Sequence, residues 1–139
     1  MRRAVAMVGC FCLVCALASL AWAGSYLDRA AILLDETRRE GDVLHPRVQD
    51  KELVRVVQAM ADARAKIAHN MEVPPAVASA HPHLLLVLEN AQRMVEAARV
   101  GNFKKFIEHL TTARDEDRAF RSLLKELGYA LPAPLSAAR

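Results

Sequence analysis

The 139-residue sequence contains few of the residues that cross-link or react, and it places them at one end. Its three cysteines are Cys10, Cys12 and Cys15, and its single tryptophan is Trp22. Residues 24–139 therefore contain no thiol for a disulfide, a thiolate metal site, a cysteine nucleophile or covalent haem attachment. Non-covalent haem ligation would need a pair of histidines, or a histidine and a methionine, facing one core layer, and the sequence predicts no such pair.

The signals of β-structure and of common enzymes are also missing. No run alternates β-branched with polar residues, and no Asn-Gly or Asp-Gly pair marks a hairpin. There is no glycine-rich phosphate loop, no serine in a nucleophile-elbow context and no repeated carboxylate–histidine pattern of a di-iron bundle. The sequence thus predicts an all-α protein that is not an enzyme.

Residues 1–23 have the pattern of a secretory signal peptide. Two arginines are followed by an apolar run up to Leu20 and then by Ala21-Trp22-Ala23, a small-x-small signal peptidase site. We expect cleavage before Gly24 and export of the protein to a periplasmic or extracellular location. The alternative is an uncleaved membrane anchor, because an apolar segment of roughly 20 residues is just long enough to span a bilayer.

Without this segment the charge is nearly balanced. The whole chain has a formal charge of +3, but removing its two N-terminal arginines leaves 17 basic and 16 acidic side chains. A nearly neutral domain has no strong electrostatic attraction to nucleic acid or to an anionic membrane. We therefore expect an unknown protein partner or self-association, no nucleic acid, and membrane contact only if residues 1–23 are retained as an anchor.

Four amphipathic segments follow the predicted signal peptide. The predicted helices span residues 26–40, 51–71, 82–100 and 103–127. Ser25, Asp50 and Asn102 are the expected N-caps, and Gly41 and Gly128 are the expected ends of the first and last helix.

Short connections determine how these helices are arranged. The third and fourth are joined by Gly101-Asn102 alone, which allows only an antiparallel hairpin. The sequence predicts an up-and-down antiparallel four-helix bundle over residues 24–130 and a flexible tail over 131–139. The alternative is a three-helix core with helix 26–40 loosely docked, because this helix is the shortest and is followed by the longest linker.

Apolar periodicity predicts which faces are buried. For the second helix the expected core stripe has 3-4-3-4 spacing, with Val57 and Ala61 beside it. Its members are Leu53, Val56, Met60, Ala63 and Ile67. In the fourth helix Asp117 falls within the apolar stripe, so it needs a partner if it is buried, and Arg64 is the candidate.

The bundle topology also predicts a cluster of possible metal ligands. His69, Met71, His81 and His83 are expected at the end where the second helix finishes and the third begins. Imidazole suits zinc or copper, and a thioether suits copper, so these four residues form a candidate Cu or Zn site. The alternative is that they are solvent-facing residues near helix termini.

Two hypotheses for function follow. The first is an exported, non-enzymatic helical bundle that acts through protein contacts, using its helix faces or the groove beside the first helix. The second is a metal- or small-ligand-binding bundle that uses the histidine cluster. Outside this second hypothesis, no cofactor is predicted.

Overall fold

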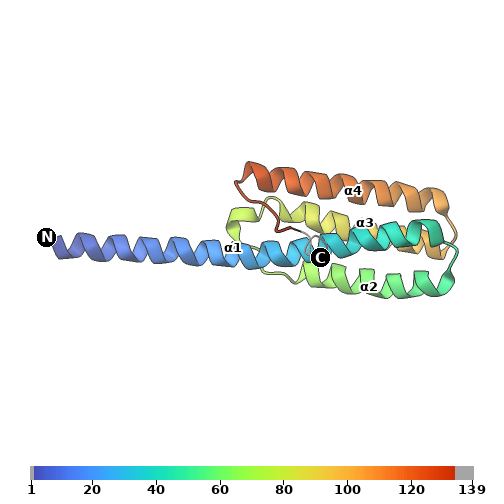
Figure 1. The fold of residues 1–139 in the computed structure, drawn as a ribbon, viewed down its shortest axis with the longest axis horizontal. Helices are drawn as coiled ribbons and strands as arrows, with labels where there is room; N and C mark the ends of the chain where they lie inside the picture. Colours follow the sequence, from blue (N-terminus) through green and yellow to red (C-terminus); the bar gives the residue numbers. More distant parts are fainter. Residues whose placement is uncertain (1, 134–139) are drawn as a thin grey trace.

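A computed structural model describes residues 2–133, with side chains from residue 23 onward. Within this range the regular secondary structure consists of four α-helices and two short 3-10 turns, and the chain forms a four-helix bundle (Figure 1). The elements are α1 (Arg2–Leu44), η1 (His45–Arg47), α2 (Lys51–His69), η2 (Pro75–Val77), α3 (His81–Arg99) and α4 (Phe103–Glu126). The predicted fold class is confirmed.

Side-chain pairs show that α2 and α3 are antiparallel. Asp62 of α2 accepts a hydrogen bond from Gln92 of α3, and the later residue His69 lies near the earlier residue Glu89. This reversed numbering is the signature of two helices running in opposite directions.

The predicted limits of the first helix are wrong. α1 continues through Ser25 and Gly41, so neither residue is a boundary, and its N-terminal part extends beyond the other helices (Figure 1). No proline interrupts this alanine- and leucine-rich stretch, and one glycine inside a helix costs only about 1 kcal/mol. The helix ends at Leu44, two residues before Pro46, whose ring is incompatible with a continuing helix.

Gly41 has a packing role in place of the predicted stop. It is buried, and a Cβ atom added there would lie 3.0 Å from the Leu110 Cδ1 atom of α4. The missing side chain therefore allows α1 to approach α4 closely at this point. Among residues 23–133, no helix is apolar over enough length to cross a membrane.

The other helix ends follow the predicted chemistry. The side chains of Asp50 and Asn102 accept hydrogen bonds from the backbone N–H groups of Leu53 and Lys105, as N-caps do. α4 ends at Glu126, and Gly128 follows it with a φ of +82°. This left-handed conformation is the usual one for glycine directly after a helix.

The segment after α4 turns back onto the bundle. Tyr129 N–H donates to the Leu124 carbonyl at 2.8 Å, and the Tyr129 side chain packs against the core. Leu131 also packs there, and Ala133 lies beside α1. The predicted flexible tail, 131–139, thus begins with packed residues, and its positions 134–139 lie outside the described residues.

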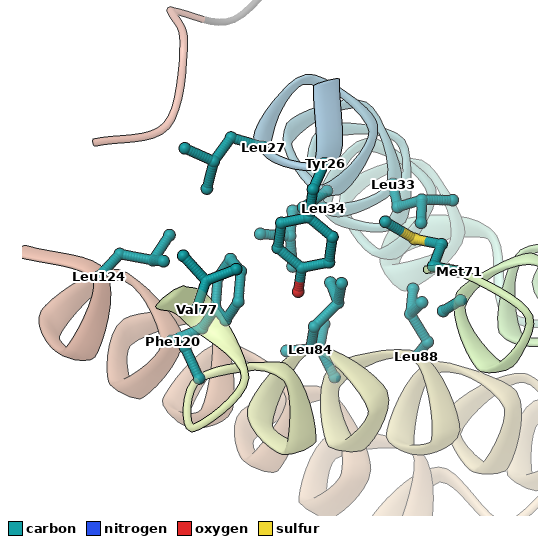
Figure 2. Packing of buried hydrophobic residues seen from close by; sticks show 14 of the residues in the cluster. Tyr26, Leu27, Leu33, Leu34, Met71, Val77, Leu84, Leu88, Phe120 and Leu124 are labelled. Carbon is teal, nitrogen blue, oxygen red and sulfur yellow. The ribbon is translucent and has the colours of Figure 1, made fainter. Parts of the chain in front are cut away.

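The core consists of two apolar clusters along the bundle axis. The first is at the end where α2 finishes and α3 begins, and Figure 2 shows Tyr26, Phe120 and Leu84 converging there. The second is at the opposite end and includes Phe106 and Leu110 of α4. The apolar stripe of α3 has helical spacing, and all of its members are buried: Leu84, Val87, Leu88, Ala91, Met94, Val95 and Ala98.

The predicted core stripe of α2 is wrong for four of its five members, whereas Leu53 packs partly buried against the core. The buried residues of this helix are Val54, Val57, Ala61, Arg64, Ala65 and Ala68. Val56, Met60, Ala63 and Ile67 are exposed. Both stripes have helical spacing, so periodicity did not distinguish them. Apart from Arg64, the buried face of α2 consists of valine and alanine, whereas the exposed stripe contains the larger Met60 and Ile67.

Candidate functional site

The end of the bundle where α2 finishes contains the predicted histidine cluster, but one of its members, His81, has a structural partner. His81 Nδ1 lies 2.9 Å from the Tyr26 hydroxyl, and the two rings meet edge to face. Burial raises the pKa of Tyr26 to about 12, so its hydroxyl keeps its proton. Burial, and then the nearby His69, lowers the pKa of His81. A neutral imidazole therefore accepts a hydrogen bond from Tyr26.

The remaining members face different surroundings. His83 Nδ1 lies 2.6 Å from a Glu116 carboxylate oxygen on α4, and His69 Nε2 lies 3.5 Å from Glu89 on α3. Met71 is buried in the first core cluster. His69 and His81 are close enough to interact electrostatically, but the four predicted ligands do not converge on one point.

No group of three histidine, cysteine, aspartate or glutamate side chains in the described part of the chain is arranged to hold a metal ion. The copper or zinc site remains a prediction from the sequence. In this structure two of its residues connect helices. His81 of α3 hydrogen-bonds to Tyr26 of α1, and His83 of α3 hydrogen-bonds to Glu116 of α4.

One charged cluster lies within the bundle, between the two apolar clusters. The Arg64 guanidinium of α2 makes two hydrogen bonds to the Glu40 carboxylate of α1, and Glu36 lies 3.7 Å away. The Arg64 side chain is only 5% exposed. Burial and then the Glu36 charge raise the pKa of Glu40, and the pKa stays above its ordinary value although Arg64 lowers it. The pair therefore joins α1 to α2 at a considerable desolvation cost.

The predicted pairing of Asp117 with Arg64 is wrong. Asp117 instead pairs at 2.8 Å with Arg121, one turn later on α4, and its side chain is partly exposed. Arg64 reaches α1 because α2 packs against both α1 and α3, whereas α4 packs mainly against α3.

The strongest candidate for a binding surface is a stripe that sequence reasoning placed in the core. We call Val56, Met60, Ala63 and Ile67 the α2 outer stripe. The side chains of Val56 and Ile67 are both 52% exposed, and Met60 is 44% exposed. The signal that could have identified this surface is the presence of two apolar stripes on one helix, because a bundle buries only one of them.

No protein-family model, curated protein or solved structure matches the chain.

Proposed function

We propose that this protein is an exported, non-enzymatic helical bundle that associates with a second copy of itself through the α2 outer stripe. The observation that supports this most directly is the stripe itself. Its four residues are spaced 4-3-4 along α2, which is the seam spacing of helices that pack in pairs. Leu53, one step earlier in the same pattern, is partly buried and packs against the second core cluster, so the exposed seam begins at Val56.

Charges beside the stripe favour an antiparallel arrangement of the two copies. Glu52 and Lys66 lie on the same flank of α2, two heptads apart, near the two ends of the stripe. In an antiparallel pair each Glu52 comes opposite the other copy's Lys66, and both contacts form at once because the arrangement is two-fold symmetric. Lys66 makes no ion pair among residues 23–133, so its charge is available.

Glu52 currently pairs with Arg55 at 2.8 Å, but both side chains are largely exposed. Such surface pairs contribute little to stability, so exchanging Arg55 for the second copy's Lys66 costs little. The apolar stripe therefore supplies the affinity, and the charged flank determines the direction of the helices.

The test compares the substitution of a valine within the α2 outer stripe with the same substitution of a valine outside it. Val56→Glu places a charge in the seam, and we expect the protein to become monomeric in sedimentation equilibrium between about 1 and 100 µM, where mass action governs association. Val100→Glu is the matched control, because Val100 is 61% exposed and follows α3. The control should leave the association unchanged.

A charge exchange tests the direction. Lys66→Glu should weaken association, and adding Glu52→Lys to it should restore association. A wild-type protein that is monomeric throughout this range would contradict the proposal, as would equal effects of Val56→Glu and Val100→Glu.

The export part of the proposal has its own measurement. Intact mass of the protein from its native host should correspond to a chain that starts at Gly24. A mass that retains residues 1–23 would contradict cleavage.

A further inference from the structure

A groove between α1 and α4, with α3 as its floor, combines an apolar interior with a cationic rim. Its volume is about 490 Å³, within the range of small-molecule sites. The floor and walls contain six buried apolar side chains: Leu34, Val87, Ala91, Met94, Leu110 and Ala113. The volume and the apolar lining suit a hydrocarbon chain.

The rim has an excess of positive charge. Arg38 of α1 and Arg114, Arg118 and Arg121 of α4 line the groove, against only two carboxylates, Asp42 and Asp117. Arg114 pairs with Asp42 across the groove, and Arg121 pairs with Asp117. Arg118 pairs with Asp115, which is outside the groove lining.

Arg38 is the rim arginine without an ion pair in the part of the chain whose side chains are described. Arg38 lines the groove from α1, and Arg118 lines it from α4. Two guanidinium groups thus border the groove from opposite walls.

A buried hydroxyl provides a second, independent observation. Thr37 lines the groove and is only 7% exposed, yet its Oγ1 atom has no hydrogen-bond partner. A buried polar group without a partner costs about 1–3 kcal/mol. Threonine in a helix has two accessible χ1 rotamers, so a ligand oxygen at the level of Arg38 can accept the hydrogen bond that the protein does not provide.

The geometry points to a binding site for an amphipathic carboxylate, a fatty acid whose chain lies on the α3 floor and whose head group contacts Arg38 and Arg118. The arginines neutralise the carboxylate, and the Thr37 hydroxyl donates to it. A neutral alcohol of the same chain length lacks the charge, and a short carboxylate lacks the chain.

The test is a calorimetric titration of the purified protein with decanoate, 1-decanol and acetate. Decanoate should bind one molecule per chain, and the other two should bind more weakly by about tenfold or more, because charge-assisted contacts and apolar burial each contribute. Equal affinity for decanoate and 1-decanol would overturn the proposal, as would the absence of decanoate binding.

Variants distinguish this site from general adhesion. Arg38→Glu should lower decanoate affinity by about tenfold or more. Arg39→Glu is the matched control, since it makes the same charge change on the next residue of α1, outside the groove lining, and should leave the affinity unchanged. Equal effects of the two variants would overturn the proposal.

Two further variants separate binding from folding. Thr37→Val should weaken decanoate binding while the protein becomes no less stable, because the substitution removes an unpaired hydroxyl. Ala91→Leu should fill the floor and weaken binding of decanoate. If Thr37→Val and Ala91→Leu both bind decanoate with wild-type affinity, this assignment is contradicted.

Discussion

Replacing Arg64 with methionine is expected to destabilise the protein by about 3–5 kcal/mol at pH 7, which is the usual cost of removing one partner of a buried ion pair. The Glu40 side chain is only 13% exposed, and it loses the guanidinium that makes two hydrogen bonds to it. Urea unfolding followed by circular dichroism measures the loss.

The pH dependence of this loss has a definite sign. Burial already raises the pKa of Glu40 above its ordinary value of 4.5, and removing the cation raises it further. A carboxyl group with a raised folded-state pKa binds its proton more readily in the folded protein. The loss of stability that its ionised form causes is therefore largest above that pKa and disappears as the pH falls toward 4.5. The difference between Arg64→Met and the wild type should therefore shrink from pH 7 to pH 5.

The double variant Glu40→Met/Arg64→Met is the control. Replacing both charges with apolar side chains removes the desolvation cost together with the attraction, so its stability should lie within about 1–2 kcal/mol of the wild type or above it. If the double variant is as unstable as Arg64→Met alone, the destabilisation comes from lost packing and not from an unpaired carboxylate, and our interpretation is wrong.

Phe120→Ala is expected to cost about 3–5 kcal/mol, the usual range for a fully buried phenylalanine. Phe120 has no exposed surface and packs in the first core cluster, where Figure 2 shows it beside Val77. A domain of this size has a total stability of only about 5–15 kcal/mol, so this variant should be close to unfolding at room temperature.

Phe103→Ala is the matched control on the same helix. The Phe103 side chain is 49% exposed and stacks only at the edge of the bundle, on Phe106 and His45. Its removal should cost clearly less, about 1 kcal/mol or below, because half of its surface is already in water. If Phe120→Ala does not fold, Phe120→Leu should unfold reversibly with a smaller loss. Equal losses at Phe120 and Phe103 would contradict the packing described here.

Much of the fold was predictable because its signals are local. The caps at Asp50 and Asn102 depend on a side chain reaching a backbone N–H group three residues away, and the turn at Gly128 depends on backbone freedom at one residue. The buried face of α3 was also predictable, since that helix lies between α2 and α4 and has one broad apolar face.

The candidate site was predicted less well because it depends on helix rotation. The sequence placed His69, His81 and His83 at one end of the bundle, but the direction of each ring depends on which helix lies beside it. The same limitation applies to Arg64, whose partner is Glu40 of α1 instead of Asp117 of α4.

By itself, the sequence determined the all-α class, the four helical segments, the antiparallel order and most helix ends, because these depend on residues close together in the chain. Only the tertiary structure decided which of the two apolar stripes of α2 is buried, and that Gly41 lies at a close approach between α1 and α4. Only the structure revealed the arginine-rimmed groove over α3. These features depend on how whole helices fit against one another, and the rotation of a helix about its axis is fixed by the shapes of its neighbours.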